Sequence, residues 1–406
     1  MTSPALPFRS ALRRPSYARA RLLLGITGVG TAVLAAIAML AFDVSSRYLS
    51  SSATQPFVAA LATLGIVFAC TQLAFLPFDM IGGALLVRRR EWASVWFGRW
   101  ARGAAVQWSL WMIAAAVLMT AARVSASRVA TWRVGDDQAV LPVLGAFVVL
   151  QVALAMLRGR LARVVSALPV QYLSDTVRHA AERAGLDPRR LTVVDSGDEG
   201  FVGGCAGLRG RQLLVPLRWT QLPTLAFAAA LARRRIIADS GVHLRGVLGA
   251  ITWNTLGFAV VLSRTNAAPG TAAGLVTIAA AMTLWAFVGV LLLPTLSRAA
   301  VFAVDRDAAR RVGVRDVAQA IELLDRWQDD EPSRSRIVET IFHPVPSRTA
   351  RLRRLSSAQG TGVRWWHTHH IARHALWLSW ASFTPLSRLV HCNVGRTALW
   401  VMLPGD

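Results

Sequence analysis

The sequence contains no lysine, so all 45 of its basic residues are arginine. Alanine is abundant throughout, and this combination is typical of a GC-rich coding bias. Against 22 acidic residues the formal charge is +23, but no nucleic-acid recognition module, RNP-like signature or zinc-finger spacing accompanies it. The charge therefore does not indicate a nucleic-acid partner, and we expect none.

Cysteine is also scarce. The three cysteines, Cys70, Cys205 and Cys392, are far apart in the sequence, which argues against both a disulfide framework and a cysteine-based metal site. A Walker loop, a dinucleotide fingerprint and a nucleophile elbow are absent as well. The common sequence signatures of nucleotide binding and serine hydrolysis are thus excluded.

Long apolar runs are plentiful, since 54% of the residues are apolar. Six runs approach the length of about 20 residues that a membrane helix needs: Leu22–Phe42, Phe57–Leu76, Ala104–Val124, Ala139–Leu157, Val247–Leu262 and Thr271–Pro294. The fifth run is the shortest and contains Asn254, so a buried hairpin made by the last two runs is an alternative to two full crossings. The first run is longer than the apolar core of a cleavable signal, and we expect it to remain as an anchor.

Arginine content alternates between the connections, which predicts orientation. The N-terminal tail and the connection 77–103 are arginine-rich, whereas the connections around Arg47 and Arg264 each hold one arginine. Both large polar stretches, 158–245 and 297 onward, fall on the arginine-rich side. We therefore expect an integral membrane protein, in a bacterial inner membrane, with both termini in the cytoplasm and the lipid bilayer as its first partner.

The polar stretches show an ordered series of elements. A helical pattern ending at Gly185 precedes a short β-rich run, two strands around a glycine-rich bend, and an amphipathic helix from Pro223; a further helix is expected to end at Gly313. The fold class predicted is a mainly α-helical multi-span membrane protein with a small α+β cytoplasmic lobe. Its parts are a four-span membrane region (1–157), the first half of the lobe (158–244), a membrane hairpin (245–295), the second half of the lobe (296–360) and a Trp/His-rich interfacial segment (361–406).

This order resembles the integral-membrane zinc metallopeptidases of the HtpX and CAAX prenyl protease family. The strand region "LTVVDSGDEGFVGGCAGLRGRQLLVPLRWTQLP", the helix "SRAAVFAVDRDAARRVG" and the element "FHPVPSRTARLRRL" resemble, in turn, the family's strand pair, its ExxxD helix and its HP motif. The resemblance covers roughly residues 160–355. It implies that the lobe is zincin-like, with a zinc-binding HExxH helix between the strands and the last two spans.

The chain contains no HExxH motif. In that motif two histidines four apart reach one Zn²⁺ from one helical face, and the glutamate between them acts as base toward the bound water. The resemblance places Ala229 and Arg233 at the histidine positions, Ala230 at the glutamate position and Val301 at the third ligand. Because none of these side chains can bind zinc or act as the base, we expect no catalytic residues, no zinc and no other cofactor.

Two family-like residues remain in the motifs. Asp305 stands at the last position of ExxxD, and we expect it to pair with an arginine such as Arg233 or Arg306. His343 matches the HP element, and the arginine that follows this element in the family is Arg348 here, one residue earlier than usual.

Two further features of the sequence could bind a metal or a peptide. His367, His369, His370 and His374 form the only histidine cluster in the sequence, and the spacing of the last two permits a metal site; we favour instead an amphipathic helix with Trp377 at the membrane boundary. A glycine-rich strand edge at Phe201, Val202, Gly203 and Gly204 is a candidate for binding an extended peptide.

The sequence predicts a catalytically inactive metallopeptidase-like protein, a pseudoprotease that binds, scaffolds or accompanies a membrane-protein partner or complex. A membrane hydrolase with its metal relocated to the histidine cluster is one alternative. A purely structural membrane subunit is the other.

Overall fold

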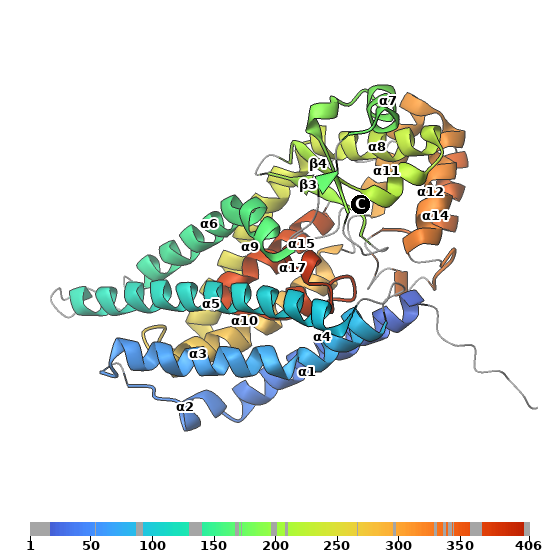
Figure 1. Cartoon of the computed structure of the whole chain (residues 1–406). Helices are drawn as coiled ribbons and strands as arrows, with labels where there is room; N and C mark the ends of the chain where they lie inside the picture. The colour runs from blue at the N-terminus through green and yellow to red at the C-terminus, as the bar shows by residue number, and fades with distance from the viewer. Residues whose placement is uncertain are drawn as a thin grey trace, which may run out of the picture.

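The computed structural model describes residues 17–401, apart from 53, 87–91, 130–139, 167–169, 172, 196–200, 208–209, 266, 295–297, 329–330, 336–337, 340–342, 344 and 358–367. In Figure 1 a bundle of long helices lies at the lower left and a smaller lobe lies at the upper right. The elements of the bundle and of its C-terminal filling are α1 (Tyr17–Ala41), α2 (Val44–Tyr48), α3 (Phe57–Ala74), α4 (Leu76–Met80), the π-helical turn η1 (Ile81–Leu85), α5 (Ala93–Val129), α6 (Val140–Ser166), α9 (Val242–Arg264), α10 (Ala272–Leu292), α15 (Thr368–Leu378), η6 (Ser379–Ser382), α16 (Leu386–Leu389) and α17 (Thr397–Val401).

Six helical segments in the described part of the chain are long and apolar enough to cross a membrane. They are α1, the continuous stretch Phe57–Leu85, α5, α6, α9 and α10. Leucine, valine and isoleucine side chains remain exposed along their outer faces, as expected for helices that contact lipid tails. The prediction of six spans is confirmed, and α9 and α10 are both long enough to cross fully, despite Asn254.

The spans form a closed ring. α3 contacts α5, α5 contacts α6, α6 contacts α9, α9 contacts α10, and α10 returns to α3, with α1 packed against α10. A ring of this kind has an interior that some part of the protein must fill.

The lobe contains a four-stranded sheet in the order β1-β2-β4-β3. Its strands are β1 (Val170–Gln171), β2 (Leu191–Val194), β3 (Gly204–Ala206) and β4 (Gln212–Pro216). β2 runs parallel to β4, with Leu191 opposite Leu213, and β3 runs antiparallel to β4, with Cys205 opposite the same leucine. β2, β3 and β4 confirm the predicted strands, whereas β1 lies in a stretch predicted as helical.

Helices from both polar stretches pack together in the lobe. They are α7 (Asp175–Arg183), the short 3-10 turns η3 (Pro188–Arg190) and η4 (Leu217–Gln221), α8 (Thr224–Asp239), α11 (Arg298–Val312), α12 (Val314–Gln328) and α14 (Arg348–Ser356). α8 contacts α7, α11 and α12, so the two halves that the membrane hairpin separates form one lobe. Gly185 and Gly313 have positive φ angles of 65° and 106°, which is why helices α7 and α11 end where the sequence predicts.

The C-terminal segment differs from its prediction. Every residue from His374 to Val390 is buried, and Trp377, Trp380 and Trp400 have no exposed surface. The elements α15, η6, α16 and α17 contact α9, α10, α5 and α6, so they lie within the ring (Figure 1). The interfacial placement of residues 361–406 was wrong for the part that is described, because tryptophan and histidine suit a boundary and a protein interior equally well.

Candidate functional site

The positions that the family resemblance assigns to metal ligands and base lie at the interface between α8 and α11. Ala229 is fully buried, Ala230 is 2% exposed and Arg233 is 6% exposed, while Val301 on α11 is fully buried. The two helices pack directly against each other. Ala229 and Ala230 have smaller side chains than histidine or glutamate, and neither methyl group can bind a metal or donate or accept a proton.

An ion-paired trio occupies this interface. Arg233 Nε donates to Asp305 Oδ1 over 2.5 Å, and Arg351 of α14 donates from Nε to Oδ2 and from Nη2 to Oδ1, each over 2.8 Å. Two hydrogen bonds in this fork arrangement are the strongest geometry available to an arginine and a carboxylate. The predicted pairing of Asp305 with Arg233 is confirmed; Arg306 takes no part in it.

The trio is a charged group inside the protein. Burial by itself would raise the pKa of the Asp305 carboxyl, but Arg233 and Arg351 outweigh it and hold this pKa below its ordinary value of 3.8. Asp305 is therefore an anion at neutral pH, faced by two guanidinium groups that stay protonated. The interface carries a net positive charge.

These residues do not fit a zinc ion. Zinc in proteins is bound by thiolate, imidazole or carboxylate groups, and the positions of the predicted ligands hold two aliphatic side chains and an arginine, which has donors only. The one carboxylate present, Asp305, is fully engaged by two arginines. A dication placed here would meet the positive charge of Arg233 where a neutral imidazole is needed.

Two arginines of α14 that follow the HP element have different partners. Arg348 begins α14 and lies 3.6 Å from Asp325, whereas Arg351, one helical turn later, reaches the α8–α11 interface. Residues three apart share a helical face, so both arginines point to the same side of α14, but only Arg351 contacts Asp305.

His343 lies apart from the trio. Its side chain is buried, its ring centroid is 5.5 Å from that of His391, and its Nε2 has no hydrogen-bond partner among the described residues. Burial first, and then the neighbouring His391 and Arg334, lower the pKa of His343 to about 2. The imidazole is therefore neutral and faces the C-terminal segment; Pro344 of the same motif lies outside the described residues.

The histidine cluster is divided by the structure. His370 and His374 lie on the helix α15 that their spacing predicted, but both are buried. His367 and the side chain of His369 lie outside the described residues. The ring of His374 meets that of His243 edge to face with centroids 4.7 Å apart, and Arg158 Nη1 lies 3.2 Å from its Nδ1. Within the described ranges no group of three or more His, Cys, Asp or Glu side chains is arranged to hold a metal ion.

The predicted peptide edge is an edge of the sheet. β3 is the last strand in the order, next to β4 alone. Phe201 is buried and the Val202 carbonyl accepts a hydrogen bond from Arg234 Nη2 over 2.7 Å. At Gly203 a Cβ atom would collide with the Leu214 carbonyl, so a side chain is excluded there. Of the four candidate residues, only Gly204 belongs to β3 itself.

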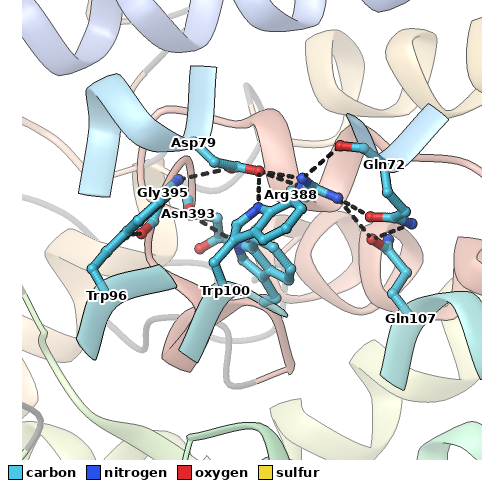
Figure 2. Close-up of polar contacts among 9 residues, drawn as sticks. Gln72, Asp79, Trp96, Trp100, Gln107, Arg388, Asn393 and Gly395 are labelled. Atoms are coloured by element: carbon cyan, nitrogen blue, oxygen red, sulfur yellow. Dashed lines mark hydrogen bonds and ion pairs between the residues drawn. The ribbon is translucent and has the colours of Figure 1, made fainter. Parts of the chain in front are cut away.

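A second buried ionic site was not indicated by the sequence. Arg388 of α16 donates from Nε to Asp79 Oδ2 over 2.6 Å and also bonds to the side chain of Gln72 (Figure 2). The Asp79 carboxylate further accepts from Trp100 Nε1 over 3.1 Å and from the backbone N–H of Gly395 over 3.0 Å. Asp79 and Arg388 are 309 positions apart, so no local pattern could have paired them.

Comparison with known proteins supports the fold. No protein-family model matches the chain and no curated protein matches it. Among solved structures, the crystal structure of Ste24p from S. mikatae matches with a TM-score of 0.65 and 13% sequence identity, over 84% of this chain and 87% of that one. At this identity the likeness concerns the fold alone: the chain has the architecture of Ste24p.

Proposed function

We propose that this protein is a membrane pseudoprotease: it keeps the fold of a membrane zinc metallopeptidase, has lost the zinc chemistry, and serves as a binding, scaffolding or accessory component of a membrane complex. The observation that carries the proposal is the Arg233–Asp305–Arg351 trio, which occupies the α8–α11 interface where the family resemblance puts the metal. The fold shared with Ste24p, a CAAX prenyl protease, agrees with that resemblance.

Loss of catalysis follows from the donor set. A zinc peptidase needs a metal to activate water and a base to take its proton, and the positions that the resemblance assigns to these tasks carry Ala229, Ala230, Arg233 and Val301. The remaining carboxylate, Asp305, has a lowered pKa and two cationic partners, which makes it a poor proton acceptor at neutral pH.

The orientation proposed is the one that arginine content predicts. Arg19 at the start of α1 donates to Glu331 over 2.8 Å, and Arg158 near the lobe end of α6 donates to the Val401 carbonyl over 2.9 Å. Both ends of the described chain thus lie on the lobe side of the bundle. With the arginine-rich side inward, the lobe and both termini are cytoplasmic, and a bacterial inner membrane is the setting we propose.

The loss of zinc is tested by restoring the site. We expect the variant Ala229→His, Ala230→Glu, Arg233→His and Val301→Glu to bind zinc when the α8–α11 backbone has kept the geometry of a metal site. The matched control keeps Arg233 and carries the other three changes; it should bind at least about tenfold more weakly, because a fixed guanidinium then replaces one ligand. A folded four-residue variant with no zinc affinity would remove the support for these assignments.

The accessory role is tested in native membranes. Crosslinking of the tagged full chain is expected to give one stoichiometric membrane partner. A broad spread of unfolded proteins would contradict the accessory role and indicate a chaperone-like one, and an absence of any specific crosslink would contradict the accessory role as well.

A further inference from the structure

The wall of the helical ring presents polar side chains to the interior. Gln72, Asp79, Gln107 and Asn254 come from the spans Phe57–Leu85, α5 and α9, and each is at most 5% exposed. Polar groups inside a membrane bundle are costly and are retained where they meet other polar groups, water or a polypeptide. The interior of this ring can therefore form hydrogen bonds with a polar segment that lies inside it.

The C-terminal segment, which we define as Thr368–Val401, is that polar segment. Arg388 bonds to Asp79 and Gln72, and Asn254 Nδ2 donates to the carbonyl of Ala375 over 3.0 Å. Phe383 stacks on Phe68 of α3 with centroids 5.1 Å apart.

Side chains of the ring bind backbone carbonyl groups near the end of the segment. Arg21 of α1 donates to the Val394 carbonyl over 2.8 Å, Trp96 Nε1 donates to the Gly395 carbonyl over 3.2 Å, and Arg158 holds the Val401 carbonyl. A Cβ atom at Gly83 would collide with the Gly395 carbonyl, so the wall is shaped to let this backbone approach.

The segment itself is not built as a membrane span. Its helices run for 11, 4 and 5 residues, far short of the roughly 20 that a crossing needs, and Phe383 between them is in the left-handed region with φ 65°. Backbone of this irregular kind is stable at membrane depth only where protein surrounds it. The segment therefore depends on the wall for its conformation.

We propose that the C-terminal segment is an intramolecular plug, and that the ring interior is a receptor for a polypeptide bearing an arginine, which the chain supplies to itself. The Asp79 carboxylate with the Gln72 side chain is the binding site for that guanidinium, and Trp100 of α5 lines it, with Arg388 Cζ 5.7 Å from the Trp100 ring centroid. Filled in this way, the interior is closed to water and to any second chain. The inference holds whether or not the lobe has lost catalysis.

Cys392 lies between Arg388 and Gly395 in the plug, so the rate at which a thiol reagent labels it reports whether the plug is in place. Cys392 is half-buried, so in the full chain with Cys70→Ser and Cys205→Ser a water-soluble maleimide should label it at a measurable basal rate. Arg388→Ala should raise that rate by about tenfold or more, because the buried Asp79 is left without its cation. The matched control is Gln151→Ala, a buried wall amide that bonds to Thr255 of α9 and not to the plug, and it should leave the rate unchanged.

The receptor is tested with a second copy of the plug. A fluorescent synthetic peptide of residues 368–401 should bind to the Arg388→Ala protein, whose own plug is weakened, at least about tenfold more tightly than to the wild type, and Asp79→Asn added to this variant should abolish the gain. If Arg388→Ala is not monodisperse in detergent, Asn254→Ala takes its place, since it loosens the plug without leaving a lone charge. A Cys392 labelling rate that does not rise in Arg388→Ala, or peptide binding that is unchanged by Asp79→Asn, would overturn the proposal.

Discussion

Replacing Asp305 by asparagine should loosen the lobe where the metal site of an active relative is expected. Asparagine keeps the size of the side chain but removes its charge, so that the buried Arg233 and Arg351 face each other without a counter-ion. Asp305 is 2% exposed and Arg233 6%, and removing one partner of a buried ion pair costs about 3–5 kcal/mol. The free energy of opening the α8–α11 interface should fall by that amount.

Hydrogen exchange measures this opening directly. In detergent at neutral pH, amides of α8 and α11 in Asp305→Asn should exchange about a hundredfold faster or more, since each 1.4 kcal/mol is about a factor of ten, while amides of α3 serve as the internal control. The rescue variant is Asp305→Leu with Arg233→Met and Arg351→Met, which removes the whole trio and should restore slow exchange. Unchanged exchange in Asp305→Asn, or a rescue variant no slower than it, would refute the argument.

Four further predictions concern the same regions. Because the folded-state pKa of Asp305 is lowered, its stabilisation is present above pH 3.8 and is lost as pH falls below it, so the acid-unfolding curve of Asp305→Asn should lack this component. His343 has a folded-state pKa of about 2 against 6.5 when unfolded; protonation of the unfolded chain should lower the stability of the wild type as pH falls from 6.5, and His343→Gln should flatten that slope in a pH series of melting curves. Arg351→Ala should cost about 2–3 kcal/mol in denaturant titrations, against less than about 1 kcal/mol for Arg348→Ala, whose partner is 3.6 Å away. Gly83→Ala should lower the yield of folded protein in detergent chromatography, because its methyl group would overlap the Gly395 carbonyl and the Trp96 indole.

The sequence predicted those parts of the fold that depend on local patterns. Six apolar runs predicted six spans, and the glycines at 185 and 313 marked helix ends because their backbone takes positive φ. Asp305 was matched to Arg233 because charge without a metal requires a counter-charge, and the family resemblance places both residues near one site. Physical rules that act within a few residues were sufficient here.

What the sequence could not predict depends on contacts between distant segments. The contact of Arg351 with Asp305 was not predicted, because the register of α14 is set by packing. The plug was missed because tryptophan and histidine favour both a membrane boundary and a buried core, and Trp377 is in the core. The Asp79–Arg388 pair joins residues 309 positions apart, which one sequence by itself does not connect.

The central claim is that the α8–α11 interface holds an ion-paired trio in place of a zinc site. Zinc analysis of the purified full chain after dialysis against zinc, beside the four-residue restored variant, tests it most directly. The account predicts less than about 0.1 equivalent of zinc in the wild type and about one equivalent in the variant, since only the latter has a donor set of the kind zinc requires. One equivalent of zinc in the wild type, lost together with any peptidase activity on Asp305→Asn, would contradict it.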